Sequence, residues 1–134
     1  MIGWSGYIVI PILTDSDILI EVFRKRDQKI QREWTSLIDS EQPLLISPVS
    51  IAELWAGVRP SEVNIVNALL DSLTCVSIDK AAGRLAGDFL QQYSRSHGLA
   101  TGDALIAACT MTNHAVLWTR NQKHYPMPEI TFWQ

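Results

Sequence analysis

The chain has only two cysteines, Cys75 and Cys109, too few for a disulfide framework or a zinc site. We expect both to be buried as small apolar side chains, in a protein of the reducing cytoplasm. No apolar run reaches the roughly 18 residues of a membrane span, and the run at 7–13 lacks the flanks of a secretory signal. Seven glycines and six prolines without a period exclude collagen-like and low-complexity chains. We therefore expect neither secretion nor a membrane partner.

The remaining composition suits a folded α/β protein. Apolar residues make up 47% and charged residues 19% of the 134 residues, which excludes disorder and allows a sizeable core. We expect a single domain over residues 1–134, in which residues 1–11 are an N-terminal extension, partly strand or disordered. Short apolar runs alternate with helical patterns, which predicts a mainly parallel sheet flanked by helices.

Apolar periodicity and capping residues predict the individual elements. Strands are expected at 8–13 (regular from Ile12), 44–46, 75–78, 115–119 and 130–133. Helices are expected from Asp17, around Ile30–Ile38, from Ser50 to Val58, after Ser61, from Asp79 to Gly98 and from Asp103 to Asn113. Ser50, Ser61 and Asp79 are the expected N-caps, and Gly98 is expected to end its helix in the left-handed conformation.

The formal net charge of −3 argues, taken alone, against nucleic acid as a partner. The distribution of charge is uneven, however. Residues 24–32 contain five of the 11 basic residues and one acid, and residues 118–125 contain Arg120 and Lys123 without an acid. Such a segment is either a solvated helix face or a contact for a polyanion. The total charge therefore does not exclude a nucleic-acid partner.

Three carboxylates, those of Asp15, Glu53 and Asp103, are the main candidates for chemistry. Asp15 follows the first expected strand, and Glu53 lies in the helix after the second expected strand. The carboxyl ends of parallel strands meet at one edge of a sheet, so side chains that follow these strands can converge there. Clustered carboxylates repel one another unless a cation lies between them, and oxygen ligands favour Mg²⁺ or Mn²⁺. The pattern is compatible with a divalent metal site.

Each carboxylate also has a purely structural interpretation. Asp15 or Asp17 would cap the first helix. Glu53 would reach back to the Ser50 amide in a capping box, and Asp103 would complement a helix dipole. An acid that caps a helix can also bind a metal, so both interpretations stay open.

Two other α/β families match less well. The run Asp15-Ser16-Asp17 resembles the nucleophile motif of haloacid-dehalogenase-like phosphatases, but no later Gly-Asp pair is followed by a further acid. A response-regulator receiver requires a Lys after a late strand, where this chain has Arg120. His124 is the only histidine in a candidate site loop, and we expect it to be a solvated loop residue.

Four short motifs, in order and at suitable spacing, resemble those of PIN-domain ribonucleases of the VapC toxin type. They are LTDSDILI at 13–20, SPVSIAEL at 47–54, GLATGDALIAA at 98–108 and LWTRNQKHY at 117–125. The resemblance covers about residues 12–133. It implies a three-layer α/β domain and a Mg²⁺- or Mn²⁺-dependent endoribonuclease from a toxin–antitoxin pair.

The resemblance also implies roles for individual residues. Asp15, Glu53 and Asp103 match the family's acidic site residues, with Asp15 and Asp103 as metal ligands. Asn121 stands where the family usually has a fourth acid, which puts tight binding of a second metal in doubt. Ser16 and Thr119 match supporting hydroxyls.

Further expectations concern Asp17 and the partners. Asp17 would partly compensate for the missing fourth acid, and the basic residues Arg120, Lys123, Arg24 and Arg26 would contact the RNA backbone. The family implies a homodimer and a VapB-like antitoxin whose peptide crosses the active site. The alternative is a catalytically weak or inert RNA- or antitoxin-binding module of the same fold.

Overall fold

A parallel sheet of four strands, in the order β3-β2-β1-β4, forms the centre of the computed structural model, which describes residues 9–133. The strands are β1 (Ile12–Thr14), β2 (Leu44–Ile46), β3 (Thr74–Cys75) and β4 (Val116–Trp118). The helices are α1 (Ser16–Arg24), α2 (Gln28–Asp39), α3 (Pro48–Ala56), α4 (Val63–Asp71), α5 (Lys80–His97) and α6 (Thr101–Thr112). Two 3₁₀ turns, η1 (Pro60–Glu62) and η2 (Gln122–His124), complete the elements.

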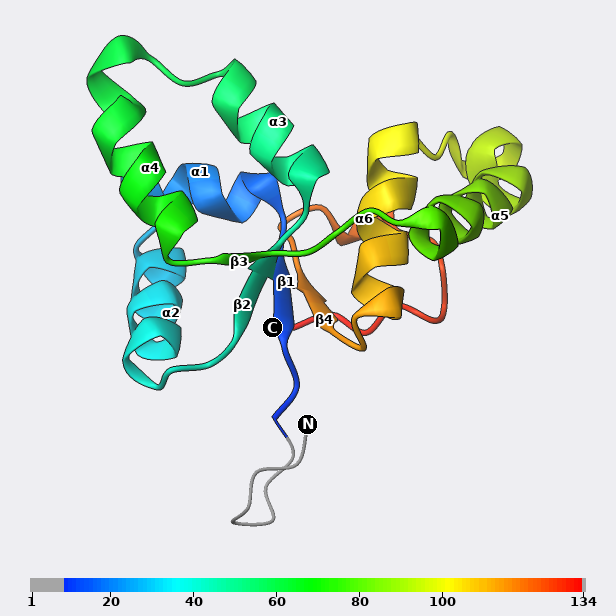
Figure 1. Cartoon of the computed structure of the whole chain (residues 1–134), viewed down its shortest axis with the longest axis horizontal. Coiled ribbons are helices and arrows are strands. Elements are labelled where there is room, and N and C mark those ends of the chain that lie inside the picture. Colours follow the sequence, from blue (N-terminus) through cyan, green and yellow to red (C-terminus); the bar gives the residue numbers. More distant parts are fainter. Residues whose placement is uncertain (1–8, 134) are drawn as a thin grey trace.

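Alternate residues of β1, β2 and β4 enter two different cores, one on each face of the sheet. Ile12 and Trp118 pack in the core covered by α1, α2, α3 and α4, whereas Leu13 and Leu117 pack in the core covered by α5 and α6 (Figure 1). This follows from the two-residue period of a strand. Both faces are therefore apolar, as expected of a parallel sheet, and the predicted three-layer α/β fold is confirmed.

The strand predictions are correct in order, and the strand at 44–46 has the predicted bounds, but the other predicted strands are too long. The run at 8–13 forms regular strand only over Ile12–Thr14, as Pro11 suggests, and residue 8 lies outside the described part of the chain. The strand predicted at 75–78 is the short β3, one residue earlier at its start. The strand predicted at 130–133 is reduced to one parallel bridge between Leu117 and Phe132.

Two of the predicted N-caps are wrong. Ser47, not Ser50, caps α3: its hydroxyl accepts the Ser50 amide at 3.2 Å, and Pro48 occupies the first helical turn, where its missing N–H costs nothing. Ser61 lies inside η1 rather than before α4. Asp79 does cap α5, accepting from the Ala82 amide at 2.9 Å.

The helix predicted from Asp103 begins two residues earlier, at Thr101. Asp103 therefore lies in the first turn of α6, where a carboxylate favours the helix dipole. The end of α5 is as predicted, because Gly98 adopts the left-handed conformation with φ of 62°.

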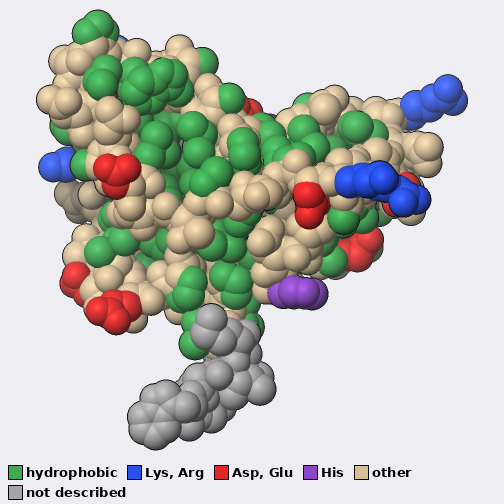
Figure 2. Space-filling view, in the orientation of Figure 1, with side chains coloured by type: hydrophobic (Ala, Val, Ile, Leu, Met, Phe, Trp, Pro, Cys, Tyr) green, Lys and Arg blue, Asp and Glu red, His purple; other side chains and the backbone are tan. Residues whose placement is uncertain are grey.

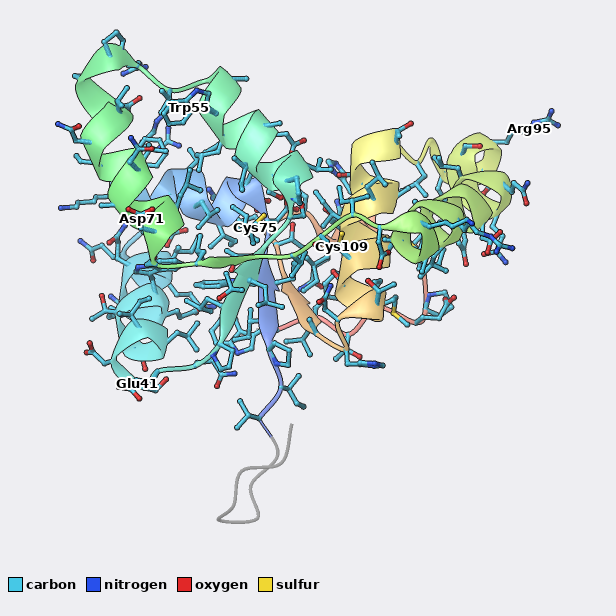
Figure 3. The ribbon with its side chains drawn as sticks, viewed as in Figure 1. Glu41, Trp55, Asp71, Cys75, Arg95 and Cys109 are labelled. Atoms are coloured by element: carbon cyan, nitrogen blue, oxygen red, sulfur yellow. The ribbon has the colours of Figure 1, made fainter. Side chains whose placement is uncertain are left out.

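The two cysteines differ in burial, which corrects the expectation for one of them. Cys109 on α6 is fully buried, but Cys75 is exposed because both residues of β3 lie on the edge strand of the sheet (Figure 3). Across residues 9–133, none of the helices has both the length and the hydropathy that a bilayer crossing requires.

Candidate functional site

A cavity of about 330 Å³ opens at the carboxyl edge of the sheet. It is lined by Asp15, Ser16, Asp17, Glu53, Ala100, Gly102, Asp103, Asn121 and His124. These residues come from the β1–α1 junction, α3, the start of α6 and the segment after β4. All three candidate carboxylates and Asn121 therefore meet around one space, although they are far apart in the sequence.

Asp15 is the most constrained of the acids and only 7% exposed. It is the N-cap of α1, and its Oδ1 accepts the Ser16 amide at 2.8 Å. Its Oδ2 accepts the hydroxyls of Thr119 at 2.9 Å and Tyr125 at 2.8 Å. The backbone amide of Asp15 also binds the carbonyl of Trp118 at 2.9 Å, which ties the end of β1 to the end of β4.

Glu53 faces Asp15 from the second turn of α3. Its Oε1 accepts the Ser16 hydroxyl at 3.1 Å. The Ser50 amide binds Ser47 instead, so the capping-box interpretation of Glu53 is wrong. A Cβ at Gly102 would lie 3.9 Å from Oε2 of Glu53, so α6 passes close to this carboxylate. Glu53 is thus directed toward the cavity and not toward its own helix end.

Asp103 reaches the cavity from the first turn of α6. Its Oδ1 lies 3.4 Å from the Tyr125 hydroxyl, and its Oδ2 lies 3.6 Å from Nδ1 of His124. The structure therefore places His124 at the site beside an acid, although the sequence predicts only a solvated residue in a candidate site loop. His124 is nevertheless 59% exposed.

Asp17 lines the same cavity and also holds the segment after β4 in place through hydrogen bonds. Its Oδ2 accepts the Arg120 amide at 3.0 Å and the Asn121 side-chain amide at 3.0 Å, and it lies 3.3 Å from the Thr119 hydroxyl, which donates to Asp15. Its Oδ1 is buried and has no hydrogen-bond partner among residues 9–133. Asn121 is thereby fixed with its N–H₂ toward Asp17.

Burial and repulsion between acids raise the pKa values of three carboxyls at the site, those of Asp17, Glu53 and Asp103. The pKa of Asp17 rises from 3.8 to about 6, mainly because of burial and secondly because of repulsion from Asp15. Burial is also the main reason why the pKa values of Glu53 and Asp103 are raised, with repulsion from Asp15 adding to both. A cation in the cavity would relieve these costs.

The donor set fits a hard divalent cation in its chemistry. The cavity offers carboxylate oxygens from Asp15, Glu53 and Asp103 and an amide oxygen from Asn121, which are the atoms that Mg²⁺ and Mn²⁺ prefer. Within residues 9–133, no three acidic, histidine or cysteine side chains stand close enough to share one ion as they are.

Three of the four basic residues predicted to contact RNA, namely Arg24, Arg26 and Arg120, pair with acids. Arg26 and Arg120 both pair with Glu21, which is 5% exposed, and the Arg120 contact is 2.9 Å. Arg24 lies 3.7 Å from Glu62. Arg26 and Arg120 keep 59% and 45% of their side-chain surface exposed, so their guanidinium groups still face solvent.

One residue at the site received no role from the sequence. Tyr125 is 4% exposed and its hydroxyl contacts both Asp15 and Asp103. Tyr125 is the last residue of the fourth motif, where an aromatic side chain reads as part of the core, and only the folded structure places its hydroxyl between two carboxylates. Its place in that motif, one residue after His124, is the signal that the sequence offers.

The fold and site together define a class of α/β protein in which carboxylates line a cavity at the carboxyl edge of a parallel sheet. The sequence profile of the PIN domain matches residues 12–129. The chain therefore belongs to the PIN-domain family.

Relatives within this family are VapC ribonucleases. The chain is 40% identical to ribonuclease VapC10 of Mycobacterium tuberculosis over 119 residues, which is 88% of each chain. It is 33% identical to ribonuclease VapC19 of the same organism over 92 residues, 68% of this chain and 74% of that ribonuclease.

Solved structures share the fold. VapBC2 from Rickettsia felis bound to a promoter DNA fragment contains a chain that superposes with a TM-score of 0.76 at 20% identity, covering 93% of this chain and all of that one. A chain of DNA-bound VapBC from Salmonella typhimurium gives a TM-score of 0.78 at 17% identity, covering 93% and 98%. At these identities the likeness concerns the fold alone.

Proposed function

We propose that the protein is a metal-dependent endoribonuclease and the toxin of a VapBC-type toxin–antitoxin pair. The observation that carries the proposal is the convergence of Asp15, Glu53 and Asp103 on one cavity of about 330 Å³. The names of the relatives at 40% and 33% identity support RNA as the substrate class. Asn121, at the position of the family's fourth acid, lines the same cavity.

Asp15 and Asp103 would hold Mg²⁺ or Mn²⁺. When bound, such an ion polarises a phosphodiester and lowers the pKa of an attacking water. Glu53, held by the Ser16 hydroxyl, orients that water and accepts its proton. Thr119 fixes Asp15, and Asp17 fixes Asn121, so the acids keep their places before substrate arrives.

Cations around the cavity would hold the RNA backbone. Arg120 and Lys123 lie on the segment that also carries Asn121, and Arg24 and Arg26 lie at the end of α1. Because Glu21 already fixes Arg120 and Arg26, these side chains lose little further entropy when they bind a phosphate. They would position the strand without reading its sequence.

The partners follow from the same proposal. A VapB-like antitoxin would lay a peptide across the cavity and offer an arginine to its acids. A homodimer would cover Trp55 on α3 and Ile65 on α4, which are 44% and 56% exposed; Figure 2 shows hydrophobic side chains gathered over the face that these helices present. The compartment would be the cytoplasm.

Cleavage of RNA by the purified chain tests the enzyme. We expect cleavage with Mn²⁺, loss of cleavage with EDTA and loss in Asp15→Asn and Asp103→Asn. Asp88→Asn is the matched control, since Asp88 is an exposed acid on α5. Cleavage that survives EDTA or Asp15→Asn would contradict the mechanism.

Growth arrest separates the enzyme from the alternative, an inert RNA- or antitoxin-binding module. Expression of the wild-type chain should arrest growth, and Asp103→Asn should abolish the arrest. Arrest that persists in Asp103→Asn, with RNA binding intact, would favour binding alone.

A further inference from the structure

Tyr125 places a hydroxyl between the two carboxylates that the proposed function assigns to the metal. Its oxygen donates to Oδ2 of Asp15 at 2.8 Å and lies 3.4 Å from Oδ1 of Asp103. The side chain is 4% exposed, and its ring meets Phe132 edge-on with centroids 6.4 Å apart. The hydroxyl is therefore held in place by the packing of the ring in the core around α6.

The hydrogen bonds at Asp15 leave the two oxygens of its carboxylate unequal. A phenol has one proton, and the shorter contact shows that it is given to Asp15 and not to Asp103. The Thr119 hydroxyl donates to the same Oδ2 at 2.9 Å. Each carboxylate oxygen has about two acceptor positions, so Oδ2 is fully used.

Oδ1 of Asp15 keeps a free position. Among residues 9–133 it accepts one hydrogen bond, from the Ser16 amide at 2.8 Å. That amide belongs to the first turn of α1, so it fixes the direction in which the carboxylate points. The remaining acceptor position of Oδ1 is the one that this carboxylate can offer to a cation.

We infer that Tyr125 is a positioning residue that presents Asp15 to the metal through Oδ1 and keeps Asp103 beside it. The inference rests on the proposed function, because that function names the metal. Donors to a ligating carboxylate orient it, and losing one typically weakens metal binding 10- to 100-fold. A phenylalanine would fill the same space, so a purely structural role predicts no such loss.

The test is Mn²⁺ binding to the full-length chain, without RNA, measured by titration calorimetry. We expect Tyr125→Phe to bind Mn²⁺ roughly 10- to 100-fold more weakly than wild type. In RNA cleavage at saturating Mn²⁺, kcat should fall while KM for RNA stays unchanged, because Tyr125 acts on Asp15 and not on the strand. Tyr93→Phe is the matched control, since Tyr93 lies on α5 with its ring against His97.

A second variant covers the case in which Tyr125→Phe does not fold. Thr119→Val removes the other donor to Oδ2 of Asp15 and should also weaken Mn²⁺ binding. Equal Mn²⁺ affinity in wild type and Tyr125→Phe, or no Mn²⁺ binding by wild type, would overturn the inference. A wild-type chain that binds Mn²⁺ but leaves RNA uncut would instead contradict the proposed function, while weaker binding by Tyr125→Phe would still support the positioning role.

Discussion

The side-chain amide of Asn121 donates a 3.0 Å hydrogen bond to Oδ2 of Asp17 and so links the segment after β4 to the first turn of α1. The same oxygen accepts the Arg120 amide at 3.0 Å. An amide at position 121 can donate to a carboxylate at 17, whereas two carboxylates would repel each other. The two positions therefore form a complementary pair of one amide and one acid.

We expect Asn121→Asp to lower the free energy of unfolding of the metal-free protein by roughly 1–3 kcal/mol at pH 7. The change replaces a hydrogen bond to a charged group with a repulsion. Adding Asp17→Asn restores a pair of one amide and one acid, with the amide now at 17 and the acid at 121. The double variant should therefore regain much of the lost free energy of unfolding. Urea denaturation of wild type, both single variants and the double variant measures the coupling. Additive effects would contradict the pairing.

Stability of the metal-free protein should fall as pH rises from about 4 to about 6. The pKa of Asp17 is about 6 in the folded chain against 3.8 as its ordinary value, so the folded state holds the proton more tightly. The resulting stability is fully present below pH 3.8 and is lost as pH rises through 6. Asp17 contributes at most about 3 kcal/mol, less what solvent screening removes.

The raised pKa values of Glu53 and Asp103 act in the same direction as that of Asp17. Thermal melts across this pH range, in EDTA, measure the effect. Asp17→Asn should flatten the dependence, and Asp88→Asn should leave it unchanged. A pH profile in which wild type and Asp17→Asn are parallel would show that Asp17 titrates normally.

The two arginines that pair with Glu21 should contribute to the free energy of unfolding jointly and not independently. It is 5% exposed and pairs with both Arg26 and Arg120. Removing one arginine leaves the other, so Arg26→Ala and Arg120→Ala should each cost about 1 kcal/mol or less. Removing both leaves a buried carboxylate unpaired, and we expect the double variant to lose roughly 3–5 kcal/mol.

Chemical denaturation of the single and double arginine variants measures this coupling. Adding Glu21→Gln to the double variant removes the unpaired charge and should restore part of the stability. If the double variant loses no more than the sum of the single variants, Glu21 is solvated and the interpretation fails.

The sequence predicts the layers of the fold better than the ends of its elements. Strands with apolar residues at every position, such as Leu44–Ile46, are typical of a parallel sheet with both faces covered, and the structure has such a sheet. The length of β3 depends instead on its place at the edge, which no local pattern reveals. The apolar residues of 130–133 pack in the two cores, Ile130 and Phe132 in one and Trp133 in the other, while the segment pairs with β4 through one bridge.

The site was predictable in its acids and in the supporting hydroxyls of Ser16 and Thr119, but not in the hydroxyl of Tyr125. Asp15, Glu53 and Asp103 follow from the rule that strand ends meet at one edge, together with the four motifs. The hydroxyl of Tyr125 reaches Asp15 over 110 positions of sequence, and only tertiary packing sets such a contact. The pairing of Arg120 with Glu21 is also long-range, so charge patterning could mark the arginine but not its partner.

The first turn of α3 offers a last test, because its cap is Ser47 and not the predicted Ser50. Ser47 is fully buried and accepts the Ser50 amide, whereas Ser61, the cap predicted for the next helix, lies inside η1. We expect Ser47→Ala to cost about 1–2 kcal/mol and Ser61→Ala less than about 0.5 kcal/mol, measured by urea denaturation. Because Glu53 lies one turn further along α3, fraying of this turn should also weaken Mn²⁺ binding in Ser47→Ala and not in Ser61→Ala. Equal stability of the two variants would mean that the side chain of Ser47 does not hold the start of α3.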